Sequence, residues 1–122
     1  MKFKPIVFAL GLLLTGCSRH DAKLADQVAG TWMSAHTVWT LSPDGSFHSH
    51  LAGTNAGIIK EAVYDGTWSV QDGFLVTTIT QRSSQNLTNL ASIGQVDHQK
   101  IVRLDSTRLV LSDGLTNTYT RK

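Results

Sequence analysis

Two histidines, His48 and His50, have the spacing that most resembles a site of chemistry in this sequence. They fall on a predicted strand with one residue between them, so both imidazoles would point to the same face of a sheet. Imidazole nitrogens bind zinc or copper, but a metal site needs at least a third ligand. His36 and His98 could contribute one, although nothing in the sequence places them nearby. We favour the alternative, a solvated outer face, and predict no metal and no cofactor.

Groups that could act in catalysis are sparse. Glu61 is the only glutamate, and several aspartates fall in predicted turns, where a carboxylate accepts backbone hydrogen bonds: Asp44, Asp72, Asp105 and Asp113. Serine, histidine and aspartate are all present, but no nucleophile elbow or other local signature accompanies them. We therefore expect a protein that is not an enzyme.

Aromatic residues on alternating strands point to binding instead. The residues that could line an apolar cup are Trp32, Trp39, Phe47, Tyr64, Trp68, Phe74 and Tyr119. From this set we select Trp32, Phe47, Tyr64 and Trp68 as the lining of a ligand site. An eight-stranded barrel is only just wide enough for side chains to fill it, so the same residues could simply form a solid core. Both interpretations stay open at the level of sequence.

The stretch 63–80 has the clearest local structure among the elements that would position these side chains. Its first half, VYDGTWSV, alternates so that Tyr64 and Trp68 share one face, and its second half, FLVTTIT, is rich in β-branched residues. Asp72 and Gly73 between the halves tolerate positive φ, which favours a tight hairpin turn.

Short strands separated by polar turns continue through the rest of the chain. We expect a strand that opens at residue 30 and further strands at 37–41, 46–51, 96–104, 108–111 and 115–121. A short helix at 24–28 would precede them, and 52–57 would form a loop. The one long irregular stretch, 82–95, is a candidate lid. Roughly eight short strands at this spacing are typical of an antiparallel sandwich or barrel.

The first residues of the chain have the pattern of a secretory signal. Lys2 and Lys4 precede an apolar run at 6–14, which is too short to cross a bilayer core. The only cysteine follows in the sequence LTGC, which resembles the lipobox of bacterial lipoproteins. That resemblance implies cleavage before Cys17 and attachment of a diacylglycerol to its thiol. Ser18, in place of an aspartate, implies sorting to the outer membrane with the protein facing the periplasm.

The charge balance argues against a nucleic-acid partner. The full chain has 11 basic and 9 acidic residues, and cleavage would remove Lys2 and Lys4, which leaves a formally neutral protein. A neutral chain without basic clusters offers little attraction to phosphates. With no second cysteine, the domain must be stabilised by its own core.

A second resemblance covers most of residues 24–121. The motifs GTW at 30–32, WTLSPDGSF at 39–47, GTW again at 66–68 before Asp72-Gly73, and KIVRL at 100–104 before RLVL at 108–111 resemble the small bacterial lipocalin-like domains. This family implies an up-and-down β-barrel, often lipid-anchored. In lipocalins a Gly-x-Trp on the first strand packs under an arginine on the last, which would here be Gly30, Trp32 and Arg121.

Together these patterns predict an all-β protein, a small up-and-down antiparallel barrel. Residues 1–16 would form a signal peptide, 17–23 a lipidated tether, and 24–122 the barrel. The predicted function is an outer-membrane lipoprotein, anchored in the membrane through Cys17, that binds a small apolar or amphipathic molecule. The alternative is a structural lipoprotein with a filled barrel, which contacts an unknown protein partner in the envelope, for example through 82–95.

Overall fold

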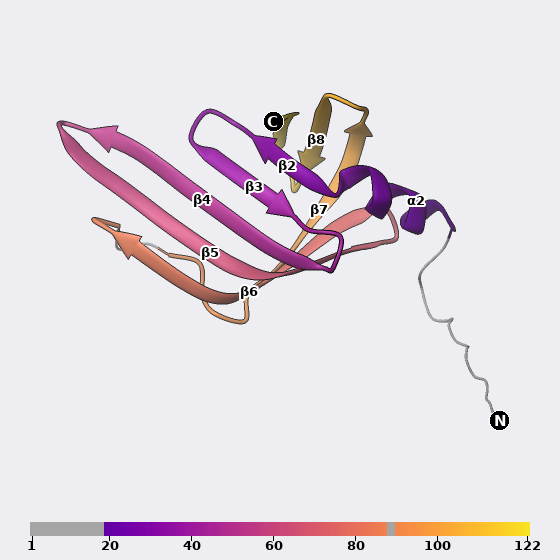
Figure 1. Ribbon diagram of the computed structural model, residues 1–122, viewed down its shortest axis with the longest axis horizontal. Coiled ribbons are helices and arrows are strands. Elements are labelled where there is room, and N and C mark those ends of the chain that lie inside the picture. Colours follow the sequence, from indigo (N-terminus) through magenta and orange to yellow (C-terminus); the bar gives the residue numbers. More distant parts are fainter. Residues whose placement is uncertain (1–18, 88–89) are drawn as a thin grey trace.

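Eight antiparallel strands close into a barrel in the computed structural model, which describes residues 19–87 and 90–122 (Figure 1). Each strand pairs with its neighbour in sequence and the last pairs with the first, so the prediction of an all-β, up-and-down barrel is confirmed. The elements are α2 (Arg19–Val28), β2 (Gly30–Met33), β3 (Thr37–Leu41), β4 (Ser46–Asn55), β5 (Ile58–Gln71), β6 (Phe74–Gln85), β7 (Val96–Leu104), β8 (Arg108–Ser112) and β9 (Thr116–Arg121).

The expected hairpin turn at Asp72 and Gly73 is confirmed. Their φ angles are 53° and 80°, and β5 and β6 pair directly on either side. Ala56 and Gly57 have φ angles of 53° and 79°, so a second tight turn joins β4 to β5. The expected loop at 52–57 was therefore wrong, because positive φ at both positions lets the strands pair up to the turn.

The predicted irregular stretch also needs correction, since β6 continues to Gln85. The last residues of β6 pair with β5 but not with β7, which pairs only with positions 74–78. Residues 52–61 and 81–85 thus form an extension of β4, β5 and β6 beyond the barrel (Figure 1). Its β6 residues are exposed, which explains why their polar sequence resembled a loop.

A bulge in β6 marks the point where the extension begins. The register changes from Asp65 opposite Gln81 to Gly66 opposite Ile79, which leaves Thr80 as the additional residue. A Cβ atom at Gly66 would collide with the carbonyl oxygen of Thr78. The glycine of the second GTW motif therefore permits the close approach of two strands.

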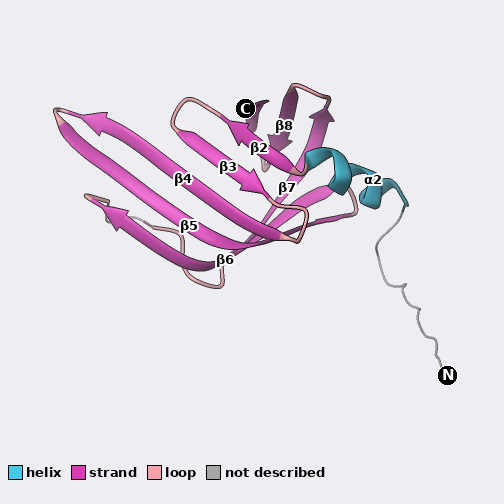
Figure 2. Cartoon of the chain, viewed as in Figure 1, coloured by secondary structure: helices cyan, strands magenta, loops and turns pink. Residues whose placement is uncertain are grey.

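Helix α2 covers one end of the barrel, which we call the closed end; the opposite end is the open end (Figure 2). Val28 is fully buried, and Leu24 and Ala25 pack against the core. The helix starts at Arg19, so residues 19–23, expected to be a tether, are helical. The physical reason is Asp21, which is 1% exposed and accepts hydrogen bonds from the amides of Asp72 and Gly73.

The apolar core is concentrated at the closed end. Its largest fully buried apolar side chains are Trp32, Leu41, Leu75, Leu109, Leu111 and Val28. These residues come from the helix and from several strands, so the core joins both sides of the sheet. In the part of the chain described here, no helix has the length and apolar character needed to span a membrane.

Candidate ligand-binding site

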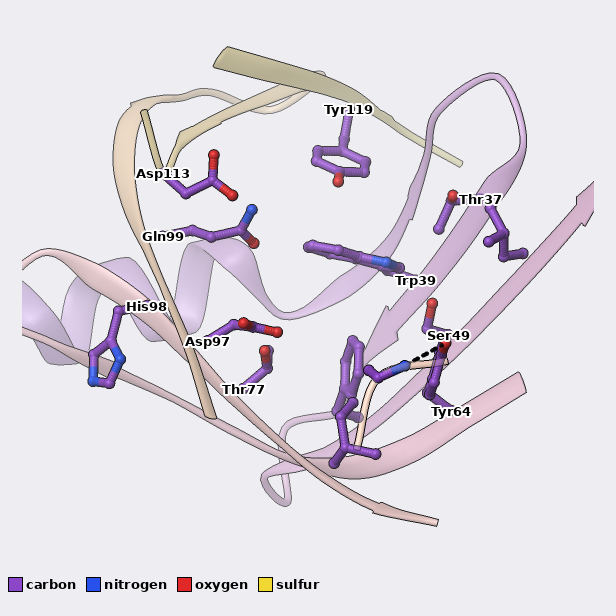
Figure 3. Close-up of a pocket in the computed structure, with 14 residues that line it drawn as sticks. Thr37, Trp39, Ser49, Tyr64, Thr77, Asp97, His98, Gln99, Asp113 and Tyr119 are labelled. Atoms are coloured by element: carbon purple, nitrogen blue, oxygen red, sulfur yellow. Dashed lines mark hydrogen bonds between the residues drawn. The ribbon is translucent and has the colours of Figure 1, made fainter. Parts of the chain in front are cut away.

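The open end of the barrel contains a cavity of about 320 Å³. Its walls come from the inward-facing positions of β3 to β7, from β9, and from the segments that join strands at this end (Figure 3). Strand residues alternate between the inside and outside of the barrel, so alternate residues of each strand reach the cavity. The lining residues are Thr37, Trp39, Phe47, Ser49, Leu51, Tyr64, Thr77, Ile79, Ala91, Asp97, His98, Gln99, Asp113 and Tyr119.

One wall of the cavity is aromatic. The rings of Trp39 and Tyr119 are stacked, with centroids 4.5 Å apart and an angle of 27° between planes. Phe47 meets Trp39 edge to face at 5.8 Å. Offset stacking and edge-to-face contacts are the favoured geometries of aromatic pairs, so this wall is a preorganised apolar surface.

The facing wall is polar. Asp97 and Gln99 point inward from β7, and Asp113 points inward from the end of β8, all toward the space beside Trp39 (Figure 3). The intervening His98 points away from that space (Figure 3). An apolar body and a hydrogen-bonding or charged group could therefore contact opposite walls at the same time.

Two hydroxyl groups deeper in the cavity have no hydrogen-bond partner among the protein residues that the structure describes. Ser49 is 5% exposed and Thr77 is 6% exposed, and both line the cavity. Within the described residues, neither hydroxyl forms a hydrogen bond with another protein atom. Burial of an unsatisfied hydroxyl costs about 1–3 kcal/mol, so these groups need a partner in the cavity, either water or a ligand.

The loop after β6 completes one side of the cavity. The Ala91 amide donates to the Tyr64 hydroxyl at 3.2 Å, and the Arg82 guanidinium donates to the Ala91 carbonyl at 2.7 Å. These contacts fix Ala91 in the wall. Of the stretch expected to act as a lid, this described part supports the cavity, while residues 88–89 lie outside the described residues.

The pKa of the Tyr119 hydroxyl depends on the burial of its ring and on a neighbouring charge. Burial raises the pKa of its hydroxyl above the usual value, and the negative charge of Asp113 raises it further. The negative charge of Asp113 is therefore close enough to the Tyr119 hydroxyl to affect its ionisation.

Of the four residues predicted to line a ligand site, the structure places two at the cavity and two away from it. Phe47 and Tyr64 line the cavity, whereas Trp32 and Trp68 do not. The two tryptophans lie in the core, and their indole N–H groups donate to the carbonyls of Val28 and Ser42, each at 2.8 Å. Sequence alternation identifies which side chains point inward, but it does not distinguish the packed end of a barrel from the hollow end.

Other lining residues were missed or only partly anticipated. Trp39 and Tyr119 belonged to the wider aromatic set but not to the final selection. Asp97 and Gln99 alternate on a predicted strand, which was the available signal, yet their partners across the barrel are distant in sequence. Asp113 was interpreted as a turn residue; its carboxylate does accept a hydrogen bond from Leu115, and it also borders the cavity.

The structure brings Gly30, Trp32 and Arg121 together at the closed end. The Arg121 guanidinium carbon lies 4.2 Å from the centroid of the Trp32 ring. A Cβ at Gly30, where φ is 138°, would lie 2.5 Å from an Arg121 nitrogen. Arg121 also donates to the carbonyls of Gln27 at 2.8 Å and Ala29 at 3.2 Å, which ties β9 to the end of the helix.

His48 and His50 lie on the outer face of β4, and each contacts a carboxylate on β5. His48 Nδ1 lies 2.7 Å from Asp65, and His50 Nε2 lies 2.7 Å from Glu61. Among the residues that the structure describes, no group of three or more histidine, cysteine, aspartate or glutamate side chains could hold a metal ion. The geometry is that of two separate imidazole–carboxylate pairs on the surface.

No protein-family model matches the sequence, and curated proteins include no significant match. The predicted lipid-attachment residue, Cys17, lies outside the described residues. Membership of the lipocalin-like lipoproteins therefore stays a prediction, whereas the closed barrel is a property of the structure.

Proposed function

We propose that this chain is a lipocalin-like lipoprotein of the bacterial envelope that binds a small amphipathic molecule in the cavity at the open end. The observation that carries the proposal is the pair of buried hydroxyls, Ser49 and Thr77, which face the cavity without a hydrogen-bond partner in residues 19–87 and 90–122. The aromatic wall supplies apolar contact opposite them. A volume of about 320 Å³ is at the lower end of the range for ligand pockets and suits a small molecule.

The mass of the native protein tests this proposal directly. Full-length protein, extracted gently from membranes, should give a native mass spectrum with a bound species above the mass of the acylated chain. Thr77→Val removes a hydroxyl while keeping the side-chain shape, so the bound fraction should fall by a factor of about 2–10. The control is Thr67→Val on the exposed outer face of β5. Spectra with only the acylated chain, in every preparation, would contradict a ligand function.

The proposal also includes anchoring of the closed end at the outer membrane. Cys17 precedes Arg19, the first residue of α2, and α2 covers the closed end. Acyl chains on Cys17 would hold that end toward the bilayer and leave the open end facing the periplasm; two or more chains give stable anchoring. Cys17→Ala should move the protein from the membrane fraction to the soluble fraction, and retention in the membrane would argue against acylation.

Exposed apolar side chains favour a second candidate, an interaction protein of the envelope. Ile58 and Ile59 at the tip of the extension are 52% and 56% exposed, Ile93 in the loop is 61% exposed, and Leu115 is 77% exposed. All four lie on segments that surround or extend beyond the open end. A photo-crosslinker at position 59 should capture a specific envelope protein if this function is correct, and only self-adducts or none if it is not.

A further inference from the structure

We propose that the ligand of the open-end cavity is a small organic cation, an amine with an apolar body. This inference rests on the proposed binding function and assigns the chemical class of its ligand. It follows from the charge, geometry and unsatisfied groups of the cavity wall.

The charged side chains that face the cavity are acidic. Asp97 and Asp113 contribute carboxylates, and the lining includes no lysine or arginine. The predicted mature chain as a whole does not share this bias, because residues 17–122 contain nine basic and nine acidic residues. An anionic ligand would meet repulsion at this wall, whereas a cation would find two carboxylates.

These carboxylates also retain capacity to accept hydrogen bonds. Asp97 accepts from the Gln95 side-chain amide at 3.2 Å, and Asp113 accepts from the Leu115 amide at 3.2 Å. In the described chain neither forms an ion pair, in contrast to Asp65, Glu61 and Asp105. A carboxylate has about four lone-pair sites, so both can still accept from an ammonium group.

The remaining groups suit the same ligand. Thr77 lies directly across from Asp97 in the pairing of β6 with β7, so its buried hydroxyl can accept from the same donor. The stacked rings of Trp39 and Tyr119 lie on the other side (Figure 3). Aromatic faces attract cations and pack against apolar groups. The raised pKa of Tyr119, to which the charge of Asp113 contributes, agrees with a negative potential at this wall.

Three probes of similar shape separate charge from hydrophobicity: 2-phenylethylammonium, 2-phenylethanol and phenylacetate. Isothermal titration of the acylated protein in detergent, with protein-free micelles as the blank, gives the affinity for each. The ammonium should bind about tenfold more tightly than the alcohol, with the carboxylate weakest. Its affinity should fall as salt is added, while that of the alcohol should not.

Substitutions in the cavity wall test whether the preference for the ammonium probe arises in the cavity. Asp97→Asn and Asp113→Asn should each weaken ammonium binding about threefold or more and should reduce the preference for the ammonium over the alcohol. Asp65→Asn, the same charge change on the outer face, should have no effect. If the alcohol binds as tightly as the ammonium, or if the cavity variants behave like Asp65→Asn, the cation inference is overturned and the proposed binding function stands. If none of the probes binds, both fall.

Discussion

Arg121, near the end of the chain, joins three segments at the closed end of the barrel. Its guanidinium donates to the carbonyls of Gln27, Ala29 and Ser106, and it stacks on Trp32. Residues near a chain terminus usually fray unless they are tied down. These contacts hold the last strand in place and allow the barrel to close.

Replacement of Arg121 should therefore destabilise the whole protein. We expect Arg121→Met to lower the free energy of unfolding by about 2–4 kcal/mol, because hydrogen bonds from a charged donor are lost. The free energy of unfolding of Arg121→Lys should lie between those of the wild type and Arg121→Met, since lysine keeps the charge but not the planar guanidinium group. Arg103→Met is the control, because its exposed pair with Asp105 spans 3.6 Å and should contribute less than about 1 kcal/mol. Urea denaturation measures all three, and an Arg121→Met curve that overlays the wild type would refute this role.

We expect Tyr119 to make stability depend on pH in the alkaline range. Its pKa in the folded state is raised by burial and by Asp113. A raised pKa contributes stability that is present below the unfolded value, near 10, and is lost as the pH rises through the folded value. Tyr119→Phe should therefore remove part of the alkaline destabilisation. Asp113→Asn should lower the pKa of Tyr119, which tyrosinate absorbance during an alkaline titration would measure. An unchanged or raised pKa in this variant would contradict the role of Asp113.

At the scale of elements, the contact between β5 and β6 depends on Gly66. A methyl group there would press on the backbone of Thr78, which cannot move without shifting the strand. We expect Gly66→Ala to cost about 2–4 kcal/mol. Gly53→Ala on β4 is the matched control, since its Cβ would make an ordinary contact, 3.8 Å from His36. Equal melting temperatures for the two variants would show that β6 can adjust.

Helix α2 is joined to the β5–β6 turn through Asp21. Removal of this carboxylate leaves the amides of Asp72 and Gly73 without their acceptor. Asp21→Ala should cost about 2–3 kcal/mol and should increase hydrogen exchange at those amides. Asp26→Ala, on the exposed side of the same helix, should have little effect on either. Unchanged exchange at the turn in Asp21→Ala would mean that the helix caps the barrel through apolar contacts alone.

Local patterns predicted the strands and their order, because alternation and turn chemistry act over a few residues. Strands 37–41 and 96–104 and the turn at Asp72-Gly73 are confirmed with their boundaries. The start of α2 was missed because it depends on a hydrogen bond between Asp21 and a turn far along the chain. The end of β6 was missed because polar residues are stable in an exposed strand when a neighbour pairs with it.

The candidate site was only half predictable for a related reason. Phe47 and Trp68 have the same inward character in sequence and both belong to the buried core, yet only Phe47 also lines the cavity. What separates them is their height along the barrel relative to α2. That height depends on the register of all the strands and on where the helix packs, and neither can be obtained from one segment alone.

At the scale of the whole molecule, the barrel has two different ends. The closed end is packed with apolar side chains and sealed by α2, whereas the open end is hollow and lined by hydroxyls, carboxylates and aromatic rings. Phe47, Ile79 and Tyr119 belong both to the core and to the cavity lining, whereas Asp97 and Gln99 lie outside the core. Substitution of Asp97 or Gln99 should therefore change affinity with little effect on unfolding, while substitution of the three shared residues should change both.

The extension has a consequence for how copies of this protein meet. The backbone of Ile79 pairs with Gly94 and Gln95 of the following loop. At 81–85, no described strand pairs with the outer edge of β6, so this edge could add a strand from another molecule. The polar run QRSSQ at 81–85 opposes such aggregation. Replacing Ser83 and Gln85 with valine should produce concentration-dependent association in light scattering, whereas threonine at both positions, which has the same shape, should not. The part of the sequence that looked least like a strand would then be what keeps an unprotected strand from polymerising.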